Sequence, residues 1–225
     1  GRLDGSIPRT GELSPNLVGK ALGMNVKEGF PVPELLAPRP PKLCDGCPHI
    51  DSYTALNEAM KSYGEYKVFA DIGCYTLGAL PPLKAIYTTV DMGASITMAK
   101  GAAEADLRPT VAVIGDSTFT HSGMTGLLDC VVDNVPVTVM ILDNGITGMT
   151  GSQKSSATGR IESICQGIGV DPEHIRVINP LPSKLEENIK VIQEELEYQG
   201  VSVIIPRREC IVWANKKRKM AKKAK

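Results

Sequence analysis

Residues 110–145 read TVAVIGDSTFTHSGMTGLLDCVVDNVPVTVMILDNG, in which two apolar runs each end in a short polar turn. The first run is Thr110–Ile114 and the second is Val137–Leu142. Neither run alternates apolar with polar residues, which is typical of strands buried on both faces of a parallel sheet. Between them, Ser122–Val132 has the length and periodicity of a crossover helix. The stretch therefore predicts one strand–helix–strand unit of a parallel sheet.

The same alternation of strands and helices extends in both directions along the chain. Further strands are predicted at Lys67–Asp71, Ala85–Val90 and Val201–Ile205. Further helices are predicted from an Asp51 N-cap to about Ser62, at Ala94–Ala105, and from a Ser183/Glu186 capping box to about Tyr198, closed by Gly200. The fold class expected from this order is α/β, a mostly parallel sheet with helices on both faces.

Three segments differ in composition. Residues 1–42 are rich in Pro and Gly and are expected to be a linker from a preceding domain, with one short helix from Ser14 that has Pro15 at its first position. Residues 43–212 form the predicted domain. Residues 213–225 form a basic tail, with seven Lys or Arg in the last ten positions. A frayed, solvated tail is expected, and a nucleic-acid contact is the alternative.

Composition limits the possible functions. Lys plus Arg and Asp plus Glu both count 25, and aromatic residues make up only 4% of the 225 residues. A base-stacking surface for nucleic acid is therefore not expected. The chain has no apolar run of the ~20 residues that a membrane span needs. Six cysteines in a chain without a secretion signal indicate metal ligands or buried thiols in a cytoplasmic protein.

Asp116 and Asn144 are the candidate metal ligands. Twenty-eight positions separate them, which fits one turn, one helix and one strand, so they are expected at adjacent strand tips. A carboxylate, an amide oxygen and a backbone carbonyl, for which Ile146 is the best candidate, suit Mg²⁺ together with phosphate oxygens. Gly115 would let the backbone approach a phosphate, and the N–H groups of Ser117 and Thr118 would donate to it. Each turn alone is a weak signal, because both are also ordinary turns.

Four cysteines stand at predicted loop positions: Cys44, Cys47, Cys74 and Cys210. Spacing alone leaves a [4Fe–4S] cluster and a zinc ion equally open. The remaining two, Cys130 and Cys165, fall within predicted helices and are expected to be buried.

The histidines and one helix start leave alternatives open. His49 follows the Cys-x-x-Cys pair and is either a solvent-exposed loop residue or part of the site. His121 has a smaller chance of facing the site, and His174 is expected on the surface. Asp91 and Ser95 are candidates either for helix capping or for cofactor contact.

The motifs together resemble a known family. Gly115-Asp116-Ser117 followed by Asn144 resembles the thiamine-diphosphate fingerprint, and residues 148–153, GMTGSQ, resemble the loop that closes over the diphosphate in 2-oxoacid:ferredoxin oxidoreductases. Residues 43–49, LCDGCPH, and 71–78, DIGCYTLG, look like the catalytic α subunit of the indolepyruvate type. The resemblance spans roughly residues 7 to 212 and implies a thiamine-diphosphate-binding fold.

The resemblance implies a set of site residues. Thiamine diphosphate would contact Gly73, Cys74, Gly93, Gly115, Asp116, Ser117, Thr118, Asn144, Ile146, Gly148, Met149, Thr150 and His49. Mg²⁺ would be held by Asp116, Asn144 and Ile146. A [4Fe–4S] cluster would be held by Cys44, Cys47, Cys74 and Cys210.

The resemblance also implies an activity and partners. The enzyme would oxidatively decarboxylate aryl 2-oxoacids such as indolepyruvate to acyl-CoA, with coenzyme A as acyl acceptor and ferredoxin as electron acceptor. A β subunit and a pyrimidine-binding domain would complete an oligomer. The activating glutamate is expected in that domain, so no catalytic residue is expected here and the segment alone should be inactive. The basic tail departs from the family, whose α subunit often ends in a ferredoxin-like segment. A non-oxidative thiamine-dependent decarboxylase, a zinc module and a nucleic-acid binder are the alternatives.

Overall fold

The computed structural model describes residues 1–27, 29–31, 33–37, 40–65 and 67–223, and it divides the chain into two units, Gly1–Pro40 and Pro41–Lys225. Positions 28, 32 and 38–39 of the predicted linker and positions 224–225 of the predicted tail lie outside the described residues. In the first unit, helix α1 spans Pro15–Ala21, and the Ser14 hydroxyl accepts a hydrogen bond from the Leu17 N–H at 3.2 Å. The short helix and its cap therefore agree with the prediction.

The second unit is built on a six-stranded sheet with the strand order β2-β1-β3-β4-β8-β7, and every pairing in it is parallel. The strands are β1 (Val68–Ala70), β2 (Thr88–Thr89), β3 (Val111–Gly115), β4 (Val137–Leu142), β7 (Ile175–Ile178) and β8 (Val201–Pro206). Strands β3, β4 and β8 are buried along their whole length, as their largely apolar sequences predict.

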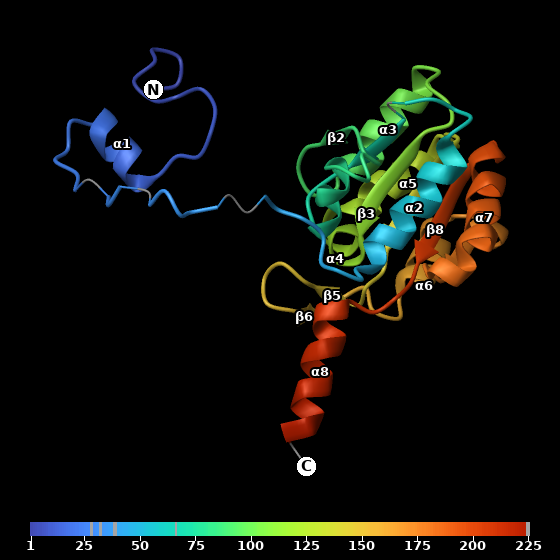
Figure 1. Ribbon diagram of the computed structural model, residues 1–225. Helices are drawn as coiled ribbons and strands as arrows, with labels where there is room; N and C mark the ends of the chain where they lie inside the picture. Colours follow the sequence, from blue (N-terminus) through green and yellow to red (C-terminus); the bar gives the residue numbers. More distant parts are fainter. Residues whose placement is uncertain (28, 32, 38–39, 66, 224–225) are drawn as a thin grey trace. The chain divides into compact units, whose positions relative to one another are not determined.

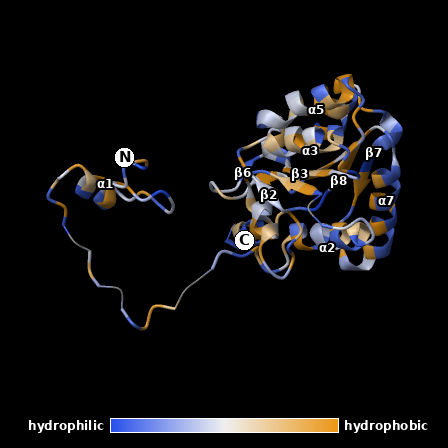
Figure 2. Ribbon diagram, turned by 90° about the horizontal axis from the view of Figure 1, so that it is seen from above, coloured by the Kyte–Doolittle hydropathy of each residue, from blue (hydrophilic) through white to orange (hydrophobic). Residues whose placement is uncertain are grey.

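Helices cover both faces of this sheet (Figures 1 and 2). One face carries α2 (Pro48–Met60) and α7 (Leu185–Glu197), and the other carries α3 (Ala94–Glu104), α5 (Met124–Val132) and α6 (Ile161–Ile168). The α/β fold class is therefore confirmed. No helix in the described part of the chain has the length and apolar character that crossing a membrane would take.

Shorter elements occupy the edges of the domain. Helix α4 (Asp116–Thr118) runs through a π-helical turn (Phe119–Gly123) directly into α5. Strands β5 (Ile146–Thr147) and β6 (Gln153–Lys154) form a small antiparallel hairpin. Three 3₁₀ turns lie at Cys74–Ala79, Pro172–His174 and Pro182–Lys184, and helix α8 spans Ile211–Lys223.

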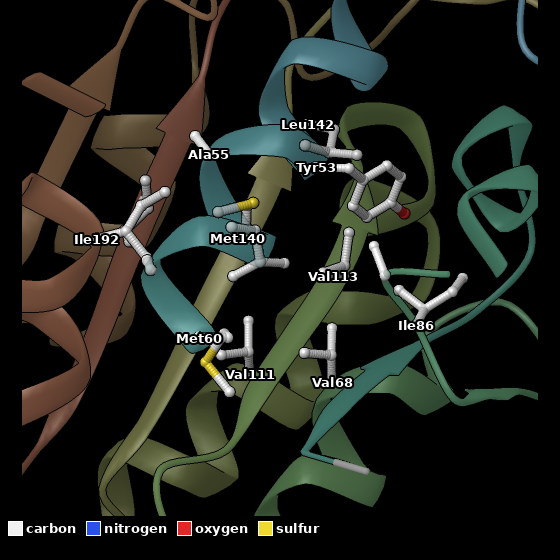
Figure 3. Close-up of a cluster of buried hydrophobic side chains, with 14 of the residues drawn as sticks. Tyr53, Ala55, Met60, Val68, Ile86, Val111, Val113, Met140, Leu142 and Ile192 are labelled. Atoms are coloured by element: carbon white, nitrogen blue, oxygen red, sulfur yellow. The ribbon is translucent and has the colours of Figure 1, made fainter. Parts of the chain in front are cut away.

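Two hydrophobic clusters hold the layers together. Alternate side chains of each strand point to opposite faces, so Val113 packs under α2 and α7 while Ile114 packs under α3, α5 and α6. Figure 3 shows the first cluster, in which Met140 of β4 lies between Ile192 of α7 and Val113 of β3. Each fully buried aliphatic or aromatic side chain stabilises the fold by roughly 1.5–3 kcal/mol relative to an exposed one. These layers fix the strand ends from which the site is built.

Several predicted boundaries are wrong. Helix α2 begins at Pro48 after Cys47, so Asp51 lies in its first turn, where the carboxylate pairs with Arg208 at 2.6 Å instead of capping the helix. Helix α7 begins at Leu185 without a side-chain cap, because Pro182 starts a 3₁₀ turn that includes Ser183. The predicted Ala85–Val90 strand shrinks to β2, since the Ala85 N–H bonds the Gly78 carbonyl outside the sheet.

Candidate functional site

Three strand tips meet at the carboxyl edge of the sheet. Strands β3 and β4 pair in register with Gly115 opposite Leu142, so Asp116 and Asn144 follow neighbouring strands. The two tips are tied together by a hydrogen bond from the Gly145 N–H to Asp116 Oδ2 at 2.9 Å. Strand β1 is the other neighbour of β3, and its continuation, residues 71–75, completes this edge. Ligands of open parallel sheets bind at such edges.

A cavity of about 310 Å³, here called the strand-tip cavity, lies at this edge. Its lining comes mainly from the turns after β1, β3 and β4, together with Met92 after β2 and one residue of α2. Twelve of the thirteen residues predicted to contact the cofactor line it: His49, Gly73, Cys74, Gly115, Asp116, Ser117, Thr118, Asn144, Ile146, Gly148, Met149 and Thr150. The structure therefore brings these residues together, and their binding role stays a prediction.

Gly93 is the one member of the predicted set outside the lining. Its backbone has φ 93°, and its N–H donates to Asp71 Oδ2 at 3.0 Å. A Cβ at this position would lie 2.6 Å from the Ser122 carbonyl oxygen. Glycine is therefore required here to join the start of α3 to the π-helical turn, and its neighbour Met92 lines the cavity instead.

Asp116 is a buried carboxylate, with only 3% of its surface exposed. Its Oδ1 accepts the Ser117 N–H at 2.6 Å and its Oδ2 accepts the Gly145 N–H. Burial nevertheless raises the pKa of this carboxyl to about 7, and the nearby Asp143 carboxylate adds to the effect. A bound cation would favour the charged form. The group therefore fits a divalent-ion ligand, since each carboxylate oxygen retains a lone pair beyond its backbone bond.

The amide of Asn144 has a fixed orientation. Its Oδ1 accepts the Ile146 N–H at 3.1 Å, so its Nδ2 faces His49 Nε2, 3.2 Å away. Because an amide nitrogen only donates, Nε2 must accept, and the ring proton is assigned to Nδ1. His49 is buried, and burial together with the Arg208 cation lowers its pKa to about 4. His49 is therefore a neutral acceptor inside the site and not an exposed loop residue.

Tyr75 and Asp71 form a buried network that the sequence analysis missed. The Tyr75 hydroxyl donates to Asp71 Oδ1, and Asp71 Oδ2 also accepts from Ser95 Oγ at 2.7 Å. The Tyr75 ring fills the space beside two glycines, since a Cβ on Gly73 or Gly115 would lie 2.3 or 2.6 Å from it. Gly115 thus makes room for this ring, and Ser95 anchors Asp71 rather than facing a cofactor.

The beginning of α4 presents donors to the strand-tip cavity. Ser117 and Thr118 line the cavity at the first turn of a helical segment that continues through α5. The Ser117 hydroxyl also lies 2.7 Å from the Thr147 hydroxyl of β5, which joins this turn to the hairpin. Backbone N–H groups at a helix start attract anions, so this wall suits a phosphate, but the predicted Ser117 N–H donor is already bonded to Asp116 Oδ1.

The four predicted cluster cysteines line a second cavity of about 230 Å³, here called the thiol cavity. Its other walls are largely apolar, with Leu43, Leu77 and Val212 among them. It shares five lining residues with the strand-tip cavity: His49, Cys74, Asn144, Gly148 and Met149. The two cavities are therefore neighbours.

Two of the thiols of this cavity are protonated in the free domain. Burial raises the pKa of Cys47 to about 11 and also raises that of Cys74, so both stay protonated at neutral pH unless a metal displaces the proton. Among the described residues, no three His, Cys, Asp or Glu side chains are arranged to hold a single metal ion. Four thiols that line one cavity are the kind and number of ligands that a [4Fe–4S] cluster takes, and the cluster stays a prediction.

The remaining predicted groups lie elsewhere. Cys130 and Cys165 are buried in α5 and α6, as expected. His121 is exposed, bonds Ser122 at 3.1 Å and does not line the strand-tip cavity. His174 is not a simple surface residue, because it stacks on Tyr198 at 3.4 Å between ring centroids and pairs with the buried Glu195 at 2.9 Å.

Comparison with known proteins finds relatives of one kind. The family model of the C-terminal TPP binding domain of thiamine pyrophosphate enzymes matches residues 71–205. Indolepyruvate oxidoreductase subunit IorA of Archaeoglobus fulgidus is 35% identical over 99% of this chain and 39% of its own length. The IorA subunit of Pyrococcus horikoshii is 35% identical over 92% of this chain and 37% of its own length. The chain thus spans about two fifths of these curated relatives.

Solved structures share the fold at low identity. A 2-oxoglutarate:ferredoxin oxidoreductase from Magnetococcus marinus matches with a TM-score of 0.62 and 19% identity, covering 77% of this chain and 66% of that one. A thiamin diphosphate-dependent enzyme from Mycobacterium smegmatis, itself described as a tentative assignment, matches with a TM-score of 0.50 and 18% identity over 69% of this chain and 31% of that one. At these identities the likeness concerns the fold alone.

Proposed function

The chain belongs to the C-terminal thiamine-pyrophosphate-binding domains of thiamine pyrophosphate enzymes, and from that premise we propose that it is part of a 2-oxoacid:ferredoxin oxidoreductase of the indolepyruvate type. The proposed enzyme oxidatively decarboxylates aryl 2-oxoacids, transfers the acyl group to coenzyme A and passes electrons to ferredoxin. The observation that carries the proposal is the pairing of Asp116 and Asn144 at adjacent strand tips beside one cavity.

Three groups of this chain would hold Mg²⁺: the Asp116 carboxylate, Asn144 Oδ1 and the Ile146 carbonyl. All three residues line the strand-tip cavity, and hard oxygen donors of this kind suit the ion. The His49–Asn144 bond keeps the amide oxygen turned away from His49. The Thr118 N–H would donate to the diphosphate, whereas the Ser117 N–H is already bonded to Asp116 Oδ1. When bound, thiamine diphosphate supplies the nucleophilic carbon and the electron sink that decarboxylation of a 2-oxoacid needs.

Cys44, Cys47, Cys74 and Cys210 would hold a [4Fe–4S] cluster in the thiol cavity. A cluster there would supply a one-electron acceptor next to the cofactor, because the two cavities share a wall that includes Cys74 and Asn144. Oxidation of one 2-oxoacid anion with one coenzyme A thiol gives an acyl thioester, carbon dioxide, a proton and two electrons, so two one-electron transfers balance each turnover.

Other parts of the enzyme complete the site in this proposal. The resemblance to the family implies that the activating glutamate comes from a pyrimidine-binding domain, and that a β subunit joins the oligomer. Of the described residues that line the strand-tip cavity, none is a glutamate. This chain would then supply the diphosphate-binding half and the cluster ligands.

The experiment that tests the metal site removes one ligand at a time in the complete enzyme. Asp116→Ala and Asn144→Ala should each lower retention of thiamine diphosphate after desalting by at least about 10-fold while leaving the fold intact, since each deletes one Mg²⁺ ligand. Asp129→Ala and Gln193→Ala, which change an exposed carboxylate of α5 and an exposed amide of α7, are the matched controls. Full cofactor retention in both ligand variants would overturn the proposal.

A non-oxidative thiamine-dependent decarboxylase is the second candidate, and the thiol cavity favours the oxidoreductase over it. Iron and acid-labile sulfide in the anaerobically purified protein, with a brown colour, are expected for the oxidoreductase. Zinc in their place would indicate a structural module. Aldehyde release from indolepyruvate without any electron acceptor would support the non-oxidative reaction.

A further inference from the structure

Helix α8 is an unusual surface element of this domain. Its described residues include six cations and no acid, and all six lie within positions 216–223. None of its side chains is buried, and Figure 1 shows the helix extending away from the sheet. Like charges three and four positions apart destabilise a helix, and a helix of 13 residues is marginal in water without packing. A negatively charged surface laid along α8 would relieve this repulsion.

Few partners for these cations come from the domain itself. Within the described residues, the ammonium group of Lys217 pairs with Glu209, and that of Lys216 lies 5.4 Å from the centre of the Trp213 ring. The described ion pairs of the domain involve none of the other four cations, Arg218, Lys219, Lys222 and Lys223. The free charge therefore points outward and is complementary to an acidic macromolecule.

A cavity of about 570 Å³ adjoins the first turn of α8 and is here called the α8 hollow. Trp213 of α8, Lys154 of β6 and Arg207 after β8 line it together with two acids, Asp143 and Glu209, and Arg207 pairs with Asp143 at 2.6 Å. Tryptophan and arginine are enriched among the residues that carry binding energy in protein interfaces, where they fill or receive anchors. The hollow thus adds a place for an apolar or aromatic anchor beside the charged helix.

The position of α8 connects this surface with the thiol cavity. Cys210 immediately precedes the helix, and the first two residues of α8, Ile211 and Val212, line the thiol cavity. The Cys210 N–H also bonds the Asn144 carbonyl at 3.2 Å, which joins the helix start to the strand tips. A macromolecule bound along α8 would therefore lie beside the four cysteines.

We propose that α8 and the α8 hollow form the docking surface for a small acidic protein that accepts one electron at a time. The inference rests on the proposed oxidoreductase function and names where its electron carrier binds. Each carrier is reduced by one electron, so two oxidised carriers dock in turn for each 2-oxoacid oxidised. The electrons come from the 2-oxoacid, and the carrier leaves reduced.

The test uses the complete enzyme with two acceptors. Lys216→Gln, Lys219→Gln, Lys222→Gln and Lys223→Gln are combined in one variant, because glutamine keeps helix propensity and removes the charge. The matched control combines Lys61→Gln, Lys84→Gln, Lys184→Gln and Lys190→Gln, which line none of the three cavities. Oxidation of indolepyruvate is followed with a purified acidic ferredoxin and with a small uncharged quinone, across a range of ionic strength.

In the α8 variant, kcat/KM for ferredoxin should fall at least about 10-fold at low salt and lose most of its salt dependence, since steering by these charges is removed. The quinone-linked rate should match the parent enzyme, and the control variant should match it with both acceptors. Unchanged ferredoxin kinetics in the α8 variant would overturn the docking site while quinone-linked turnover leaves the proposed function standing. Loss of binding to an RNA oligonucleotide or to anionic vesicles, with ferredoxin kinetics unchanged, would also overturn it. A parent enzyme inactive with both acceptors would instead reject the underlying function.

Discussion

At the scale of the single residue, Asp116 combines a position suited to binding a cation with a burial that disfavours its charged form. Its carboxylate is placed to hold a cation, yet in the free domain its burial raises its pKa to about 7 from an ordinary value of 3.8. Between these pH values the folded chain binds more protons at this group than the unfolded chain does. The contribution of Asp116 to the free energy of unfolding is therefore fully present below about pH 4 and is lost as pH rises through about 7.

The direction of this pH dependence can be tested by comparing the stability of the parent protein with that of Asp116→Asn. In EDTA and without cofactor, Asp116→Asn should become more stable than the parent as pH rises, with a gain on the order of 2–4 kcal/mol by about pH 8. Urea unfolding of both proteins at several pH values measures it. His49, whose pKa is lowered to about 4, acts in the opposite direction in nearly the same pH range, but it is present in both proteins and cancels in the difference. A difference that does not change with pH would contradict the prediction.

His49 is expected to act through Asn144. In the parent protein Asn144 Nδ2 lies 3.2 Å from His49 Nε2. His49→Leu removes this acceptor inside a buried site, which should lower the free energy of unfolding by about 1–3 kcal/mol. His49→Gln can place a side-chain oxygen at the same point and should lose much less. Titration of Mg²⁺ and thiamine diphosphate should rank affinity as parent, then Gln, then Leu. Equal affinities for the Gln and Leu variants would exclude this role.

At the scale of the secondary-structure elements, Tyr75 fixes the spacing of the tips of β1 and β3. Its ring occupies the space beside Gly73 and Gly115. Gly115→Ala should therefore displace the ring or the strand tip and lower the free energy of unfolding by about 1–3 kcal/mol. Gly101→Ala is the matched control, because no atom lies within 4 Å of a Cβ there and the residue is inside α3. It should raise stability by about 0.5–1 kcal/mol. Thermal unfolding compares the two, and equal midpoints would show that the ring does not limit the spacing.

Strands buried on both faces were predictable within about a residue. Strand β4 has the predicted bounds, β8 differs by one residue at its end and β3 by one residue at both ends, because largely apolar runs identify doubly covered strands. Edge strand β7 was missed, since its burial alternates irregularly and it pairs on one side only. The β5–β6 hairpin was missed because each of its strands has two residues. The tail was expected to fray, yet Lys, Arg and Ala favour the helix seen in α8.

The site was predictable where chemistry-bearing residues follow buried strands. Asp116 and Asn144 could be placed together because parallel strands end at one edge. The Asp71–Ser95 bond joins residues 24 positions apart across a helix start, and no periodic pattern signals such a pair. The burial of His49 likewise depends on α2 starting at Pro48, a boundary that the expected Asp51 cap placed four residues too late.

At the scale of the whole molecule, the domain concentrates two kinds of ligand at one sheet edge. Oxygen ligands and backbone N–H groups stand among apolar side chains in the lining of the strand-tip cavity, and four thiols line the thiol cavity. The shared wall means that a group bound in one cavity lies next to a group bound in the other. Neighbouring sites of this kind suit one-electron transfer, and the helix start of α8 also lines the thiol cavity.

In the proposed enzyme this chain supplies cofactor ligands, and another part supplies the activating glutamate. The strand-tip cavity offers metal and phosphate ligands, while its described lining contains no glutamate and the buried Asp71 carboxylate is already bonded to Tyr75, Gly93 and Ser95. The purified chain should therefore bind Mg²⁺ with thiamine diphosphate, detectable by calorimetry, and yet not oxidise indolepyruvate with any acceptor. Adding the missing parts of the enzyme should restore turnover. Oxidation of indolepyruvate by the isolated chain would show that an activating group lies within these 225 residues after all.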